Sequence, residues 1–225
     1  MTETLPLFPL GTVLLPGASL PLHVFEPRYR QLTVDLVTGA LPNRVFGVVA
    51  IREGFVSGDD LGSLRPVGCS ALLREARRLS DGRFDIVTRG ERRFRLVSVD
   101  STAAPYLVGE VEWLPDTPTP VPVAEVLPLM ADAARAAHQR YCAAAWHRED
   151  WTAPPPGTSH DLLAYELAGD CLLSMEDRQR LLEETSPARR LRLVRRMLHR
   201  EAGILAALRA VPVPFAEFGH TPHPN

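Results

Sequence analysis

The sequence contains no lysine, and all 25 of its basic residues are arginine. Arginine keeps its charge at physiological pH and forms no Schiff base, so it cannot take over the catalytic chemistry of lysine. The chain therefore has neither the lysine of a phosphate-binding GxxxxGK[ST] loop nor the base of a serine–lysine hydrolytic dyad. A pyridoxal enzyme, which needs a lysine anchor, is excluded on the same ground. We expect a protein that is not an enzyme and that carries no cofactor.

Cysteine and long apolar runs are also scarce. The three cysteines, Cys69, Cys142 and Cys171, form neither a CxxC pair nor a disulfide framework, which suits a reducing cytoplasm. No basic leader precedes the apolar start, and no apolar run reaches the length of a membrane span. The formal net charge is −2 over 225 residues, so overall charge favours neither nucleic acid nor a membrane as partner. We expect a cytoplasmic location and no membrane partner.

The stretch from Leu5 to Arg30 begins extended and ends helical. Its prolines forbid a helix at first and push the residues before them toward extended geometry. Three short extended runs are predicted there, over Leu5–Leu10, Gly11–Leu15 and Leu20–Phe25. Pro27 then suits a first helical position, and Gly39 suits the residue that follows a helix.

This stretch carries a family resemblance. The segment LPLFPLGTVLLPGASLPLHVFEPRYRQL resembles the opening of the Lon-protease N-terminal domain in its stand-alone bacterial form, without the ATPase and peptidase. The segment VGCSALLREARRLSDGRFDIVTRGERRFRLVSV resembles the next part of that domain, and the helical tail from about Leu162 to Leu205 also fits. The resemblance implies an α+β fold, a PUA-like antiparallel β-barrel followed by a C-terminal helical bundle. It also implies a role in recognising protein substrates.

The first half of the chain reads as several short strands. A continuous apolar run and a following strand precede the turn Ser80-Asp81-Gly82, and two alternating runs separated by Gly90 follow it. Phe84 and Phe94 share the apolar side of these runs, so both are expected to face inward. Strands at this spacing favour a barrel or sandwich. The predicted strands are Arg44–Arg52, Val67–Leu79, Arg83–Thr88, Arg92–Val99 and Tyr106–Leu114.

The second half reads as helices after a proline-rich joint over Thr117–Pro122. Ser159 and Ser174 are each expected to cap a helix, and a long apolar face begins after Pro187. We therefore predict a barrel subdomain over 1–117, a helical subdomain over 123–210 and a flexible tail over 211–225.

One predicted helix carries His138, Cys142 and His147, which raises the alternative of a small metal-dependent hydrolase. His138 and Cys142 are four residues apart, so a metal could in principle bridge them. A zinc site wants further ligands, and none is spaced to supply them. A partly buried helix face is the simpler interpretation, and no metal site is predicted.

A local basic surplus in Arg74–Arg95, eight arginines against four acids, raises a second alternative, an RNA-binding PUA-like module. The same arginines could hold acidic peptides through bidentate bonds. Readers of RNA expose aromatic rings for stacking, whereas Phe84 and Phe94 are expected in the core. A solvated hairpin face is the simpler interpretation, and nucleic acid is not the expected partner.

The residues Glu26, Arg28 and Tyr29 match the family's F-E-P-R-Y element one by one. Glu26 is expected beside the helix start, with Arg92 or Arg93 as its partner. Trp113, Trp146 and Trp151 flank the joint, where at least one could lie between barrel and helices.

These observations favour a non-catalytic module that binds other proteins or unfolded polypeptide segments, as an adaptor or holdase. We expect exposed apolar segments to bind in a groove where barrel meets helices. The candidate binding residues are Glu26, Arg28, Tyr29, Arg92 and Trp113.

Overall fold

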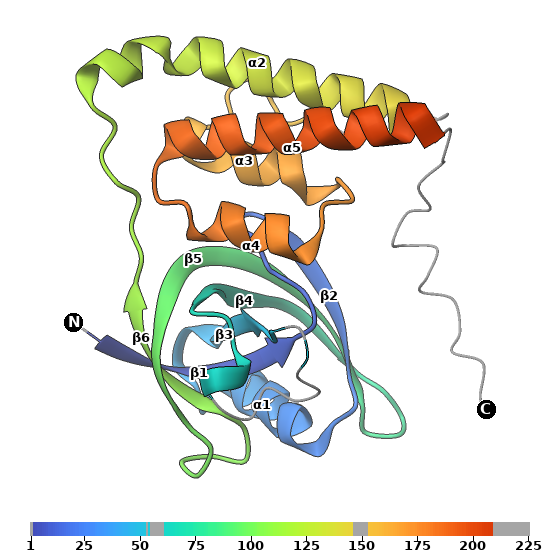
Figure 1. Cartoon of the computed structure of the whole chain (residues 1–225). Helices are drawn as coiled ribbons and strands as arrows, with labels where there is room; N and C mark the ends of the chain where they lie inside the picture. The colour runs from blue at the N-terminus through green and yellow to red at the C-terminus, as the bar shows by residue number, and fades with distance from the viewer. Residues whose placement is uncertain (1, 53, 55–60, 146–152, 209–225) are drawn as a thin grey trace.

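The computed structural model describes residues 2–52, 54, 61–145 and 153–208. Its first half is a six-stranded sheet whose pairings run in the order β2-β5-β4-β3-β1-β6 (Figure 1). A further pairing between β5 and β6 closes the sheet on itself and leaves β2 as an added edge. The strands are β1 (Thr2–Leu10), β2 (Ser19–Val24), β3 (Val45–Ala50), β4 (Val67–Arg78), β5 (Phe84–Asp100) and β6 (Val108–Trp113).

The sheet is mixed, which corrects the expectation of an antiparallel barrel. β1 pairs in parallel with β3, with Leu7 opposite Gly47, while the other pairings are antiparallel. Parallel neighbours need a long crossover. Here β2 and helix α1 (Pro27–Thr38) supply it, because the chain leaves β1, pairs β2 with β5 and returns through α1 to β3.

Gly90 does not separate two strands, as the sequence suggested, but lies within the single long strand β5. Its amide donates to the Ala18 carbonyl and its carbonyl accepts from the Gly17 amide. A Cβ at this position would overlap the carbonyl oxygen of Leu15. Glycine in a strand often marks such a close backbone approach. Gly90 therefore lets the loop that contains Leu15 pack against β5 without interrupting the strand.

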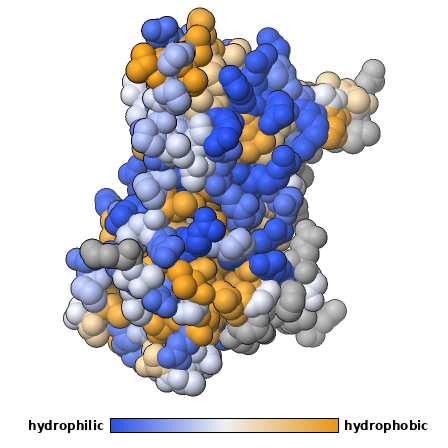
Figure 2. All heavy atoms as spheres, turned by 60° about the vertical axis from the view of Figure 1, so that its left-hand side comes forward, coloured by the Kyte–Doolittle hydropathy of each residue, from blue (hydrophilic) through white to orange (hydrophobic). Residues whose placement is uncertain are grey.

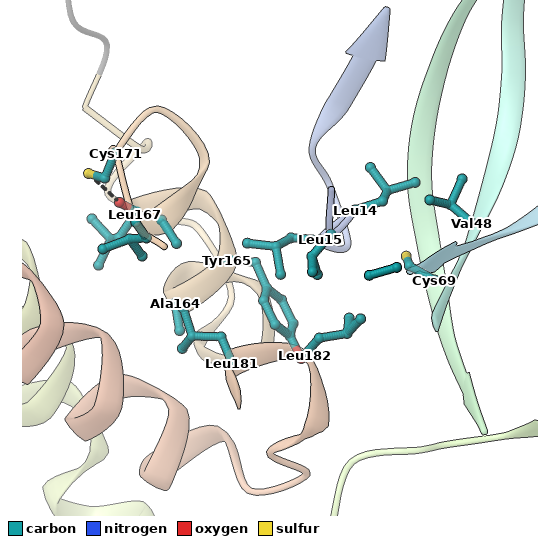
Figure 3. Close-up of a cluster of buried hydrophobic side chains, with 14 of the residues drawn as sticks. Leu14, Leu15, Val48, Cys69, Ala164, Tyr165, Leu167, Cys171, Leu181 and Leu182 are labelled. Carbon is teal, nitrogen blue, oxygen red and sulfur yellow. Dashed lines mark hydrogen bonds between the residues drawn. The ribbon is translucent and has the colours of Figure 1, made fainter. Parts of the chain in front are cut away.

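The loop beside Gly90 includes the predicted extended run Gly11–Leu15, which pairs with none of the described strands. Val13, Leu14 and Leu15 are instead buried. Figure 3 shows Leu14 and Leu15 between the sheet, represented by Val48 and Cys69, and the helical side, represented by Tyr165 and Leu182. One continuous core therefore joins both halves of the described chain.

The helices follow the predicted order. Helix α1 ends at Gly39, whose φ of 82° suits glycine, and the side chain of Ser174 caps α4 by accepting from the amide of Asp177. Ser159 precedes α3 without a side-chain cap bond. The apolar face predicted after Pro187 is confirmed, since Leu191, Val194 and Leu198 are fully buried. The C-terminal helices are α2 (Val121–Ala145), α3 (His160–Gly169), α4 (Met175–Glu183) and α5 (Pro187–Leu208).

The helices stack on one side of the sheet. Helix α4 lies nearest the strands, and α2, α3 and α5 lie beyond it (Figure 1). Gln179 of α4 donates to the carbonyl of Val67 in β4 at 3.0 Å, which ties this layer to the sheet. The α+β class is thus confirmed, while the division at 117 and 123 stays a prediction. The tail over 211–225 lies outside the described residues.

Candidate functional site

A groove of about 660 Å³ opens where the sheet meets the helices, and we call it the junction groove. Its apolar members come from the loop after β1, the end of β6 and helix α3. Figure 2 brings the side of β6 and the following linker forward and shows apolar and polar atoms intermixed where the two halves meet. Half of the lining residues are charged, so the groove is less apolar than predicted. The lining residues are Pro16, Glu91, Arg92, Arg93, Glu112, Trp113, Leu114, Pro115, Asp116, Asp161, Leu162 and Tyr165.

Arg92 and Trp113, two of the predicted binding residues, meet at this groove. The Arg92 guanidinium lies 3.9 Å from the centre of the Trp113 ring, at cation–π distance. Trp113 also packs edge-on against the buried Phe94. Both residues also line a neighbouring hollow of about 380 Å³, which Glu91 borders as well. The pair therefore forms a shared wall between two adjoining hollows.

A largely buried ion cluster, which the sequence did not predict, lies at the base of the groove. Asp116 of the linker accepts hydrogen bonds from Arg93 of β5 and Arg190 of α5. Arg93 also donates to the carbonyls of Leu182 and Glu184. Burial, the largest single influence, would lower the pKa of Arg190, but the hydrogen bonds to Asp116 and the nearby acidic groups together outweigh burial and raise the pKa, so Arg190 stays charged. This cluster fixes the position of the helices against the sheet.

Two buried polar atoms beside the groove have no hydrogen-bond partner among the described residues. They are the indole Nε1 of Trp113 and the hydroxyl oxygen of Tyr165. Buried polar atoms are usually hydrogen-bonded, so each exception calls for an explanation, and a functional site is one. The carboxylates of Glu91, Glu112 and Asp161 likewise have no ion pair within the described part of the chain.

The other predicted binding residues form a separate group at the start of α1. Glu26 pairs with Arg28 at 3.1 Å, and the Arg28 guanidinium lies 4.7 Å from the centre of the Tyr29 ring. Tyr29 is buried and stacks on Phe8 at 3.9 Å between ring centres. The expected pairing of Glu26 with Arg92 or Arg93 is wrong, because those arginines contact Trp113 and Asp116. Glu26 and Tyr29 border a hollow of about 170 Å³ apart from the junction groove.

The metal alternative receives no support from the described residues, among which no three His, Cys, Asp or Glu side chains gather as ligands. His138 and Cys142 do lie in contact, with Nε2 and Sγ 3.6 Å apart. Burial lowers the pKa of His138 and raises that of Cys142 to about 11. The thiol is therefore protonated at neutral pH and a poor ligand or nucleophile. His147 lies outside the described residues.

The basic surplus of Arg74–Arg95 is partly neutralised. Arg77 pairs with Asp85 at 2.6 Å, and Arg83 pairs with Asp81 at 2.6 Å. Phe84 and Phe94 are buried, which confirms the prediction that they face inward. The described hairpin thus offers neither ring for base stacking.

The sequence missed Asp116, Asp161 and Leu162 as groove residues and Arg190 as their neighbour. Asp116 lies in a proline-rich joint that reads only as a linker, and its partner Arg190 is 74 residues away. The exposed Leu162 was the one available signal, because it falls outside the apolar stripe of its helix. Of the predicted tryptophans, Trp113 lies at the junction, while Trp146 and Trp151 lie outside the described residues.

The described residues thus define an α+β protein, a closed mixed sheet with helices stacked on it and an open groove between them. None of its described helices has the length and apolar content that a membrane crossing requires. Residues 4–200 match the family described as the ATP-dependent protease La (LON) substrate-binding domain. The chain belongs to this family.

Individual relatives agree with the family match. The chain is 28% identical over 218 residues to Lon protease 2 of Myxococcus xanthus, covering 90% of this chain and 24% of that protein. It is 30% identical over 116 residues to Lon protease of Parabacteroides distasonis, covering 51% of this chain and 14% of that protein. The chain therefore spans about a quarter or less of these relatives, and its 225 residues contain the N-terminal domain with no ATPase or peptidase domain.

Two solved structures share the fold. The Lon N-terminal domain protein from Xanthomonas campestris is 28% identical, with a TM-score of 0.57, covering 93% of this chain and 99% of that one. The N-terminal domain of Mycobacterium avium complex Lon protease is 21% identical, with a TM-score of 0.64, covering 87% of this chain and 98% of that one. The Lon N-domain fold is thereby shown.

Proposed function

We propose that this chain is a non-catalytic module that binds polypeptide segments exposing apolar side chains, and that it binds them in the junction groove. The observation that carries the proposal is the groove itself, which offers the Trp113 ring and an exposed Leu162 where sheet meets helices. Aromatic and aliphatic side chains at the mouth of an open cleft are typical anchors for a partner chain. Such a module could act as an adaptor or holdase, either alone or beside a protease.

The family supports this proposal, since its members are described as the substrate-binding domain of a protease. We also infer that the closed sheet is a PUA-like barrel, and the β5–β6 pairing supports this. Fold alone does not assign function, because one fold hosts many kinds of site. The groove residues, rather than the fold, are therefore what an experiment must test.

The charges of the junction groove predict a preference for the charge of the bound segment. Glu91, Glu112 and Asp161 contribute carboxylates that form no ion pair with any described residue, while Arg93 is already bound by Asp116. Arg92 is the remaining cation, and it lies over the Trp113 ring. We therefore expect the module to prefer apolar segments that carry a basic residue over those that carry an acidic one.

The test uses a fluorescein-labelled peptide of alternating Leu and Ser with one Arg, and a matched peptide with Glu in place of Arg. Binding is measured by fluorescence anisotropy. Leu162→Ser should weaken binding of the Arg peptide by about tenfold, the value of one apolar side chain removed from water. The control Val37→Ser changes a valine of α1 that is 50% exposed and lies outside the groove, and it should leave binding unchanged.

Two results would contradict the proposal. One is equal binding by the parent chain, Leu162→Ser and Val37→Ser, which would place the peptide elsewhere. The other is no binding by a chain that circular dichroism shows to be folded. Tighter binding of the Glu peptide than of the Arg peptide, lost in Leu162→Ser, would overturn the charge preference alone.

A further inference from the structure

Helices α4 and α5 border a second groove, of about 960 Å³, whose lining is predominantly basic, and we call it the α5 groove. Its cationic side chains come mostly from one exposed side of α5. Arginines at such spacing are ordinarily the solvated polar face of an amphipathic helix. The structure shows that they border a hollow instead. The basic members are Arg180, Arg189, Arg192, Arg195, Arg196 and His199.

Three of these arginines are exposed and have no ion pair among the described residues: Arg192, Arg195 and Arg196. Arg189 differs, because Glu184 holds it at 3.1 Å, and Arg180 lies 3.9 Å from Asp177. Like charges three and four residues apart on a helix repel each other. A bound anion would relieve that repulsion and pair the free guanidinium groups.

We propose that the α5 groove is a second binding site, and that it takes an acidic polypeptide segment. Arginine binds carboxylates through two parallel hydrogen bonds, and its fixed charge needs no change of pH. Arg192 and Arg196 are one helical turn apart, about 6 Å along the axis, which is also the spacing of acidic residues four apart on a partner helix. The partly buried Leu193 lines the same groove and offers an apolar contact to that helix.

The composition of the groove favours a polypeptide over a nucleic acid. Its described lining residues include no Phe, Tyr or Trp, so His199 offers the single ring on which a base could stack. Glu183 and Glu184 lie in its wall and would repel a continuous line of phosphates. A peptide can place an apolar or a basic side chain opposite those two glutamates. The net charge of −2 also gives the whole chain no long-range attraction for nucleic acid.

The experiment compares two triple variants with the same loss of charge. The first is Arg192→Gln/Arg195→Gln/Arg196→Gln in the α5 groove. The control is Arg74→Gln/Arg78→Gln/Arg89→Gln on the β4–β5 hairpin, where all three arginines are exposed and have no ion pair among the described residues. The probe is a labelled helical peptide with Glu at every fourth position and Leu beside it, titrated in about 50 mM and about 300 mM salt.

We expect the parent chain and the hairpin control to bind the peptide alike. The α5 variant should bind it at least about tenfold more weakly. Added salt should weaken binding to the parent chain more than to the α5 variant. Leu162→Ser should leave this binding unchanged, which separates the α5 groove from the junction groove.

Three outcomes would overturn the proposal. Equal loss in both triple variants would mean attraction to overall charge rather than to a site. No binding by the folded parent chain at low salt would remove the site. Tighter binding of a single-stranded oligonucleotide than of the peptide, lost in the α5 variant, would make the groove a nucleic-acid surface and refute the polypeptide assignment.

Discussion

Arg190 and Arg192 are two residues apart on α5, yet they lie in opposite environments. Arg190 is fully buried at the junction, bonded to Asp116 and to the carbonyl of Glu184, with its guanidinium 4.7 Å from the centre of the Tyr165 ring. Arg192 is exposed and lines the α5 groove without an ion pair among the described residues. The comparison teaches that position on the helix, not residue type, decides whether an arginine supports the fold or remains available to a partner.

The largest effect should come from breaking the junction cluster. Arg190→Met should lower the free energy of unfolding by about 3 kcal/mol, because the half-buried Asp116 loses one of its two arginine partners and the carbonyl of Asp161 loses a donor. Arg192→Gln should change it by less than about 0.5 kcal/mol, as expected of an exposed residue. Urea denaturation of both variants measures the difference. Equal stability of the two variants would contradict the contrast drawn between them.

A smaller loss is expected where the loop beneath the junction approaches β5. Gly90→Ala should cost on the order of 2 kcal/mol, because the added Cβ overlaps the Leu15 carbonyl and forces the backbones apart. Gly157→Ala is the matched control, since a Cβ there meets nothing within 4 Å. Thermal unfolding of the two variants would show whether the loop is held as closely as the structure indicates. Similar melting temperatures for Gly90→Ala and Gly157→Ala would refute the close approach of this loop to β5.

The smallest effect concerns a buried base that stays neutral, in contrast to Arg190. Burial lowers the pKa of His138, a shift that the nearby Asp170 partly opposes. The unfolded chain therefore takes up a proton near pH 6.5 while the folded chain does not. The contribution of neutral His138 to the free energy of unfolding is fully present above pH 6.5. It declines as the pH falls toward the lowered pKa.

The free energy of unfolding, measured between pH 7.5 and about 5, tests this pH dependence. We expect a shallower decline in His138→Gln than in the parent chain. A parent slope that survives in His138→Gln would show that other groups cause the decline.

The helices and most strands could be predicted from local pattern. Proline and glycine positions gave the bounds of α1, and apolar spacing gave the buried face of α5. What failed depended on distant partners. Gly90 resembles a strand break in the sequence, because the Leu15 carbonyl that approaches it is distant in the chain. The parallel pairing of β1 with β3 depends on where the intervening strand β2 joins the sheet.

The site was half predictable for the same reason. Trp113 was expected near the joint and lines the junction groove, and Arg92, expected as a partner of Glu26, lines it too; that either residue binds a partner stays a prediction. Asp116 could not be found, since a single acid in a linker carries no local pattern and its partners lie in β5 and α5. The sequence showed the arginines of α5 but not that they border a groove.

The central claim is that polypeptide segments bind in the junction groove, and photo-cross-linking tests it most directly. The chain has no lysine, so amine-directed reagents would report only its N-terminal amine, whereas a benzophenone peptide reacts with nearby C–H bonds. With the apolar, arginine-bearing peptide, mass spectrometry should place the cross-links in Trp113–Asp116 and Asp161–Tyr165. Cross-links concentrated on α1 or the exposed side of α5, or spread evenly over the surface, would contradict the account.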